Sequence, residues 1–136
     1  MITPVFADTS YFLALVSPRN PLHARAVALS EVLAEPVVTS AWVIQELADA
    51  LAPPPARSGF LHLLDTLVAD PETTIVEPDQ ALWRRALVLY RARPDRRWSL
   101  TDCVSFEIMR DRGITRALTS NHCFEQAGFR ALLMPE

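Results

Sequence analysis

The sequence contains no lysine, so all 13 of its basic residues are arginines. Its three glycines, Gly59, Gly113 and Gly128, lie far apart, which excludes a glycine-rich phosphate loop. The two cysteines, Cys103 and Cys123, lack the spacing of a thiolate metal site. No uninterrupted apolar run approaches the roughly 20 residues that cross a bilayer. These absences predict a protein with no membrane segment and no thiolate metal centre.

The length and composition predict one domain over residues 1–136. The chain has 136 residues and half of them are hydrophobic, which is enough for a core of ordinary size. Its first four residues carry no basic flank and run directly into an apolar segment, unlike a signal peptide. We therefore expect a cytoplasmic protein whose thiols stay reduced.

The arginines are unevenly distributed. The formal net charge is −3, which does not by itself indicate a nucleic-acid-binding protein. Six arginines nevertheless lie between positions 84 and 97. This cluster has two interpretations, a solvated helix face or a phosphate-contacting surface, since planar guanidinium groups bind phosphate oxygens in pairs.

Short apolar patterns separated by helical patterns predict the fold class. Parallel strands need long crossover connections, and each apolar segment is too far from the next for a hairpin. The sequence therefore predicts an α/β three-layer sandwich, with a central, mainly parallel sheet flanked by helices. The expected strands are residues 5–7, 37–40, 74–77, 116–119 and 131–134.

Capping signals indicate where the helices between these strands begin. Asn20 precedes Pro21 and predicts a helix start there, and Ser40 predicts the start of a helix over residues 41–52. Further helices are expected over residues 56–68 and from Pro78. Ser99 and a carboxylate three residues later form the pattern of a capping box, for a helix that runs to about residue 112.

Three acids stand among apolar neighbours: Asp8 directly after the first strand, Glu46 in the helix after the second, and Asp102 in the capping box. Carboxylates on the buried side of a segment are costly unless they are paired or bind a cation. A divalent ion such as Mg²⁺ or Mn²⁺ relieves their mutual repulsion and prefers oxygen ligands. The alternative interpretation assigns Asp8 and Asp102 to helix caps and Glu46 to a boundary position.

Four segments carry a resemblance to a known family. They are DTS at 8–10, WVIQEL at 42–47, SLTDC at 99–103 and LTSNHCF at 118–124. In order and spacing they resemble the PIN domain family, in particular VapC-type toxins of bacterial toxin–antitoxin modules, over nearly the whole chain. The resemblance implies a PIN-like fold, Mg²⁺- or Mn²⁺-dependent endonucleolytic cleavage of single-stranded or loop RNA, and a cognate antitoxin that occludes the site.

The resemblance also implies roles for particular residues. By position, Asp8, Glu46 and Asp102 match the three core acids that hold the metal ion. Thr9 or Ser10 matches the hydroxyl group that supports the first acid or its metal. We therefore expect these five side chains to lie together at the carboxyl edge of the sheet.

Asn121 departs from the family pattern, because a fourth catalytic acid usually stands at that position. An amide brings one neutral oxygen and no charge, so a second metal ion would have fewer charged ligands than the first. This departure keeps a second function open: a catalytically weak PIN-like module that binds RNA or a partner protein.

Surface contacts are the least specific expectation. The arginines expected to steer the RNA backbone are Arg19, Arg84, Arg96 and Arg97. The many apolar helix faces are compatible with a homodimer. A phospho-acceptor receiver domain also places an acid at a strand end, but it relies on a lysine, which this chain lacks.

Overall fold

Five short strands form one parallel sheet in the order β3-β2-β1-β4-β5, in a computed structural model that describes residues 2–134. The central strand β1 (Val5–Ala7) pairs with β2 (Val37–Ser40) and with β4 (Arg116–Leu118). The edge strands are β3 (Thr73–Val76) and β5 (Arg130–Ala131). All four pairings are parallel, which confirms the predicted sheet.

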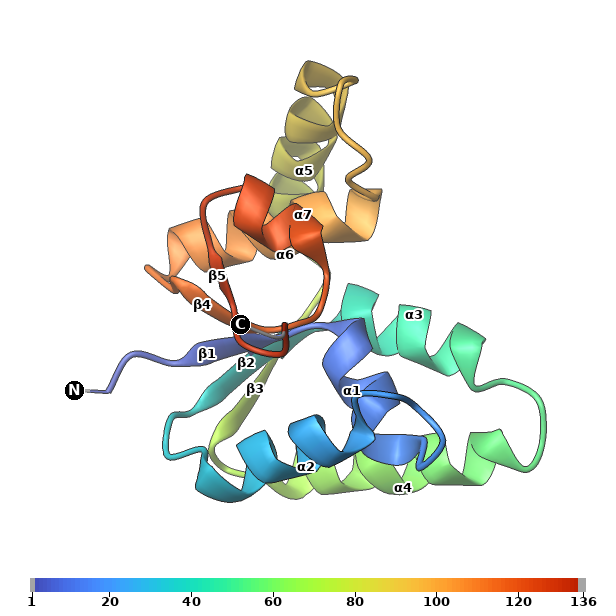
Figure 1. Ribbon diagram of the computed structural model, residues 1–136. Coiled ribbons are helices and arrows are strands. Elements are labelled where there is room, and N and C mark those ends of the chain that lie inside the picture. Colours follow the sequence, from blue (N-terminus) through green and yellow to red (C-terminus); the bar gives the residue numbers. More distant parts are fainter. Residues whose placement is uncertain (1, 135–136) are drawn as a thin grey trace.

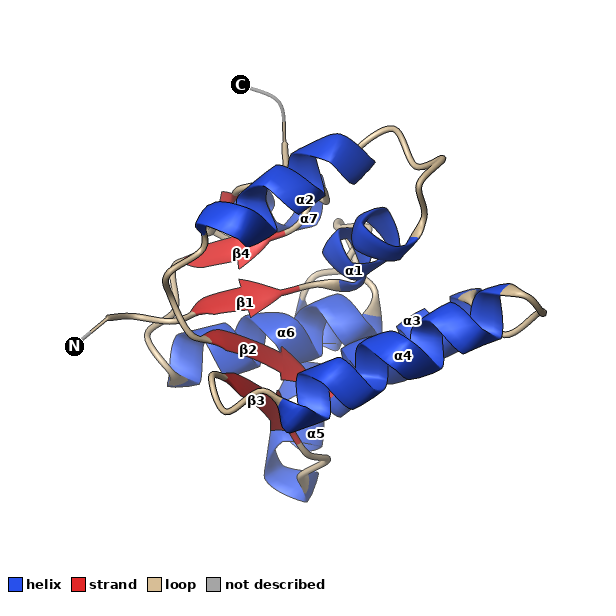
Figure 2. Ribbon diagram, turned by 90° about the horizontal axis from the view of Figure 1, so that it is seen from below, coloured by secondary structure: helices blue, strands red, loops and turns tan. Residues whose placement is uncertain are grey.

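Helices cover both faces of this sheet. In Figure 1, α1, α2 and α4 lie below the strands while α5, α6 and α7 lie above them, and Figure 2 shows the lower layer from beneath. This arrangement confirms the three layers expected from the sequence. None of the helices described within residues 2–134 is long and apolar enough to cross a membrane. The helices are α1 (Thr9–Val16), α2 (His23–Val32), α3 (Ala41–Ala50), α4 (Ala56–Ala69), α5 (Gln80–Ala92), α6 (Leu100–Asp111) and α7 (His122–Gln126).

Aromatic packing holds the upper layer together. The ring of Phe106 in α6 meets the rings of Trp98 and Phe124 edge-on, at centroid distances of 5.1 and 5.0 Å. Aromatic pairs favour this geometry, and all three side chains are buried. The loop before α6 and the short helix α7 are therefore both fixed against α6.

The helix predicted from Pro21 begins two residues later, at His23. The side chain of Asn20 accepts a hydrogen bond from the backbone N–H of Leu22 at 2.9 Å. An Asn side chain that bonds the backbone two residues on closes a turn, so Asn20 forms a turn ahead of the helix and does not cap it.

The last strand is also shorter than predicted. It covers Arg130–Ala131, whereas the apolar pattern predicted residues 131–134. The chain turns at residues 132–133, although their N–H groups still donate to the carbonyl oxygens of Ala117 and Thr119 at 2.9 and 3.1 Å. The apolar side chains in this segment fill the core rather than extend the sheet, since Leu133 is fully buried.

Candidate active site

Asp8 stands directly after β1, at the carboxyl edge of the sheet. It occupies the N-cap position of α1, but its side chain makes no capping hydrogen bond. Its Oδ2 accepts instead from the hydroxyl groups of Thr119 at 2.8 Å and Ser10 at 3.2 Å. The buried carboxylate of Asp8 therefore faces the end of β4, and capping does not explain why an acid is present here.

Glu46 reaches the same edge from α3, which follows β2. The cap of this helix is as predicted, because the Ser40 side chain accepts from the N–H of Val43. The Thr9 hydroxyl donates to Glu46 Oε1 at 2.5 Å, which joins the first turn of α1 to α3. The two hydroxyls after Asp8 thus have different partners: Ser10 bonds Asp8, and Thr9 bonds Glu46.

Asp102 lies in the first turn of α6 and forms the predicted capping box with Ser99. The Ser99 N–H donates to Asp102 Oδ2 at 2.9 Å, and the Ser99 hydroxyl accepts from the Asp102 N–H at 3.0 Å. The other carboxylate oxygen, Oδ1, faces the amide nitrogen of Asn121 at 3.5 Å. Asp102 is therefore both a cap and a member of the site, with one oxygen for each role.

The orientation of Asn121 follows from its place before α7. Its side-chain oxygen accepts from the N–H of Cys123 at 2.9 Å and so caps that helix. The amide nitrogen consequently points toward Asp102. The residue at the position of a fourth acid thus donates toward a carboxylate, and its oxygen is already used by α7.

The three acids influence one another electrostatically. The pKa of Asp8 is raised from 3.8 to about 6, chiefly by burial, with smaller contributions from the negative charges of Asp102 and Glu46, while the Thr119 hydrogen bond opposes the rise. The pKa of Asp102 is raised chiefly by burial, with a contribution from Glu46. These contributions indicate that the three acids lie close enough to repel one another.

The chemistry of this pocket fits a divalent cation. Three carboxylates offer hard oxygen donors, and no arginine within residues 2–134 forms an ion pair with any of them. Their charge therefore lacks compensation from the part of the chain that the structure describes. In the same residues, no three His, Cys, Asp or Glu side chains are already arranged around a common point.

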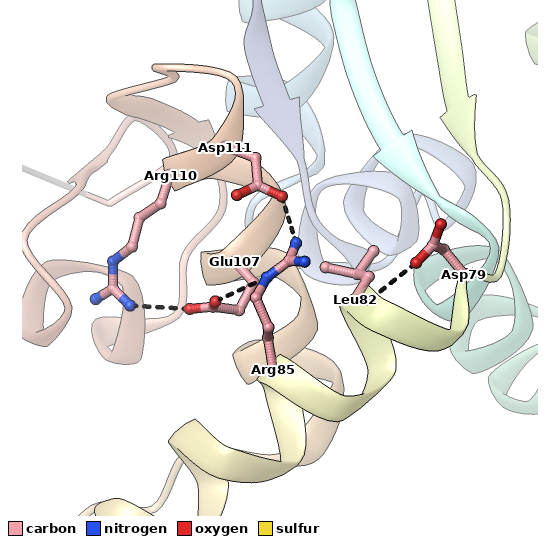
Figure 3. Close-up of polar contacts among 6 residues, drawn as sticks. All are labelled: Asp79, Leu82, Arg85, Glu107, Arg110 and Asp111. Atoms are coloured by element: carbon pink, nitrogen blue, oxygen red, sulfur yellow. Dashed lines mark hydrogen bonds and ion pairs between the residues drawn. The ribbon is translucent and has the colours of Figure 1, made fainter.

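The other acids of α6 belong to a separate network (Figure 3). Glu107 pairs with Arg85 at 3.5 Å and with Arg110 at 3.2 Å, while Asp111 pairs with Arg85. These contacts join α5 to α6 and neutralise both acids. α6 therefore carries compensated acids toward its end and an uncompensated one, Asp102, at its start.

The arginines proposed to contact RNA lie in different places. Arg96 and Arg97 line a cavity that also includes Ser99, the capping partner of Asp102. Arg19 lines another hollow, with residues of the α3–α4 connection, and Arg84 is exposed on α5. Arg96 and Arg97 thus lie near Asp102, and the RNA-contacting roles of all four arginines stay predictions.

Thr119 is a site residue that the sequence analysis missed. It is fully buried, donates to Asp8, and accepts from the N–H of Asn121 at 3.0 Å. The signal that could have identified it is positional. Thr119 follows β4 directly, as Asp8 follows β1, and these two strands are neighbours in the sheet.

We expect Thr119→Val to raise the pKa of Asp8 above that of the wild type. Valine has a similar shape but cannot donate the hydrogen bond that lowers this pKa. The titration of the Asp8 carboxyl carbon, followed by NMR in EDTA, measures the change, with Thr119→Ser as the matched control that keeps the hydroxyl. An unchanged or lower Asp8 pKa in the valine variant would contradict the assigned role.

Comparisons with known proteins identify the family and support the fold. A family model described as "PIN domain" matches residues 5–130. No curated protein matches the chain. The solved structure of VapC20 from Mycobacterium tuberculosis, described as a sarcin-ricin loop cleaving toxin, is 24% identical with a TM-score of 0.85, over 92% of this chain and 95% of that one. FitAcB from Neisseria gonorrhoeae is 18% identical with a TM-score of 0.64, over 93% and 94%. At these identities, the structural likeness supports the fold.

Proposed function

This chain belongs to the PIN domain family, and we propose that it is a metal-dependent endoribonuclease that acts as the toxin of a toxin–antitoxin pair. The observation that carries the proposal is that Asp8, Glu46 and Asp102 lie close enough to interact electrostatically, without a compensating cation among the described residues. A toxin that cleaves an RNA loop is among the proteins with a similar fold, which supports the same substrate class.

In this proposal, some residues of the site would bind the metal ion and others would hold the metal-binding carboxylates in place. Asp8, Glu46 and Asp102 would hold Mg²⁺ or Mn²⁺ through carboxylate oxygens. An ion bound there supplies a nucleophile generated from water at neutral pH, and positive charge beside the scissile phosphate. Ser10 and Thr119 hold the Asp8 carboxylate, and the capping box holds that of Asp102.

The proposed partners follow from the toxin assignment. A cognate antitoxin would cover the carboxylate edge of the sheet and keep RNA away from the acids. We also retain the cytoplasmic location and the homodimer expected from the sequence as parts of the proposal.

The proposal is tested by incubating the purified protein with a panel of single-stranded and stem-loop RNAs in Mg²⁺. We expect cleavage within single-stranded or loop segments, loss of cleavage in excess EDTA, and recovery when Mg²⁺ or Mn²⁺ is added back. Sequencing of the product ends identifies the cleaved bond.

A second candidate is a catalytically weak module that binds RNA or a partner protein. Asn121 favours it, because the amide brings no charge to the position of a fourth acid and its oxygen already caps α7. RNA binding without cleavage in either metal ion would support this candidate and overturn the nuclease.

A further inference from the structure

A cavity of about 570 Å³ opens between the end of α5 and the loop that leads into α6. Ligand sites in proteins commonly have volumes of about 300–1,000 Å³, so it has the size of a site for one small ligand. The residues that line it are Tyr90, Arg91, Arg93, Pro94, Arg96, Arg97, Trp98, Ser99 and Cys103.

The charge of the cavity is positive, because its lining includes four arginines and no acid. Arg93 is neutralised by Asp95, with two hydrogen bonds of 3.0 and 2.9 Å. Within residues 2–134, no carboxylate pairs with Arg91 or Arg97. The Nε of Arg96 is buried and has no hydrogen-bond partner in the same part of the chain, but it lies 3.8 Å from Asp95 Oδ2. The guanidinium groups of Arg91 and Arg97 thus retain their full capacity for an anion, and that of Arg96, partly compensated by Asp95, retains some.

The cavity adjoins the acid pocket. Ser99 lines the cavity and donates its N–H to Asp102, and Cys103 follows Asp102 directly in α6. The loop before α6, which separates the cavity from the acids, is attached to α7, because the Trp98 ring N–H donates to the side-chain oxygen of Gln126 at 3.0 Å. If a single strand of nucleic acid lay across the acids, a neighbouring nucleotide of that strand would therefore reach this cavity.

One aromatic ring is available in the cavity. Tyr90 is 48% exposed, whereas Trp98 is only 5% exposed. Arg93 and Arg96 lie over the Trp98 ring, at 5.1 and 6.0 Å from its centroid. Unpaired bases stack readily on exposed aromatic rings. Tyr90 is therefore the ring that a base can use.

We propose that this cavity binds one nucleotide of a single-stranded RNA beside the scissile bond. Its phosphate lies against Arg91, Arg96 and Arg97, and its base stacks on Tyr90. The choice of RNA rests on the function proposed above. An acidic protein segment would also meet positive charge, but a stacking ring next to guanidinium groups in a volume of this size favours a nucleotide.

The test measures binding without catalysis. Fluorescent six-nucleotide RNAs are titrated with the protein in EDTA, and anisotropy gives the affinity at several salt concentrations. We expect Arg91→Gln and Arg97→Gln each to weaken binding by about tenfold, as for the loss of one hydrogen bond to a charged group. Each should also reduce the slope of log affinity against log salt by about 0.7, the value for one phosphate contact on a single strand.

Matched variants separate the cavity from general effects of charge. Arg112→Gln removes the same charge at the opposite end of α6 and should leave both affinity and salt slope unchanged. Tyr90→Ala should weaken binding by about tenfold, and Tyr90→Trp should preserve it. Thermal melting shows that each variant is folded.

Each outcome supports or overturns the proposal separately from the nuclease. If Mg²⁺ supports no cleavage but binding still depends on Arg91, Arg97 and Tyr90, the cavity stands and the nuclease fails. If RNA is cleaved but these variants bind with wild-type affinity and salt slope, the cavity proposal fails and the nuclease stands. Hexaglutamate binding that depends on the same arginines, without RNA binding, would overturn the choice of RNA.

Discussion

Asp102→Asn is expected to abolish RNA cleavage while the protein remains folded. Asparagine keeps an oxygen that accepts the Ser99 N–H, so the capping box survives, while the charge and the oxygen that faces the Asn121 amide are lost. We expect the cleavage rate to fall on the order of 10²-fold or more, the size of effect found when one electrostatic group is removed from a catalytic site. Circular dichroism and a cleavage assay in Mg²⁺ measure the two parts of this prediction.

Two further variants make the result interpretable. Glu107→Gln neutralises another acid of the same helix, one that pairs with arginines on its outer face, and should keep cleavage near the wild-type rate. Asp102→Ala removes the charge and the cap together, and should cost about 1 kcal/mol of stability in addition to the activity. Cleavage at the wild-type rate in either Asp102 variant would show that this acid does not take part in the reaction.

Asp8→Asn is expected to stabilise the metal-free protein at pH 7.5. The native pKa of Asp8 is raised from 3.8 to about 6, so the native state holds its proton more tightly than the unfolded chain does. The free energy of unfolding therefore falls as the pH rises from about 4 to about 6. Above that range the ionised carboxylate costs about 3 kcal/mol, from a shift of about two pKa units. Asparagine keeps an acceptor for Thr119 and removes this cost.

Urea unfolding in EDTA at several pH values measures the effect. The wild type should lose stability between pH 4 and 6, and Asp8→Asn should lose less. Asp95→Asn is a control that should instead lower the stability, because the hydrogen bond and ion pair with Arg93 lower the pKa of Asp95 to about 2.

Mn²⁺ should raise the melting temperature of the wild type but not of Asp8→Asn. A less stable Asp8→Asn protein, or the same Mn²⁺ effect in both proteins, would refute the assigned role of Asp8.

The sheet could be predicted because its strands carry a strong local signal. Residues 5–7 and 37–40 are short apolar runs followed by polar caps, and they form β1 and β2 within those limits. Where the local signal was ambiguous, the observed strand boundaries differ from the predicted ones, as in β5. The apolar side chains of residues 132–133 are consistent with a strand or with a turn packed on the core, and only tertiary contacts decide between them.

The site could be predicted in outline for a related reason. In a parallel sheet, residues that follow neighbouring strands meet at one edge, so the approach of Asp8 and of the helix that carries Glu46 follows from the topology. Asp102 instead comes from the start of α6, which follows α5 and precedes β4. Thr119 lies at the same edge but bears no charge, and threonine is common after a strand, so composition did not distinguish it. The turn of the Asn121 amide toward Asp102 depends on α7, a five-residue helix too short for a periodic pattern.

The hydrogen bond between Thr119 and Asp8 joins residues 111 positions apart in the chain. A ribosome must therefore synthesise most of this protein before its first acid acquires that partner, since β1 gains its neighbour β4 only late in translation. Nascent chains that end before β4 would carry Asp8 without the Thr119 hydroxyl that holds its carboxylate. The surroundings of the first acid are thus completed only when the last strands of the sheet have been made.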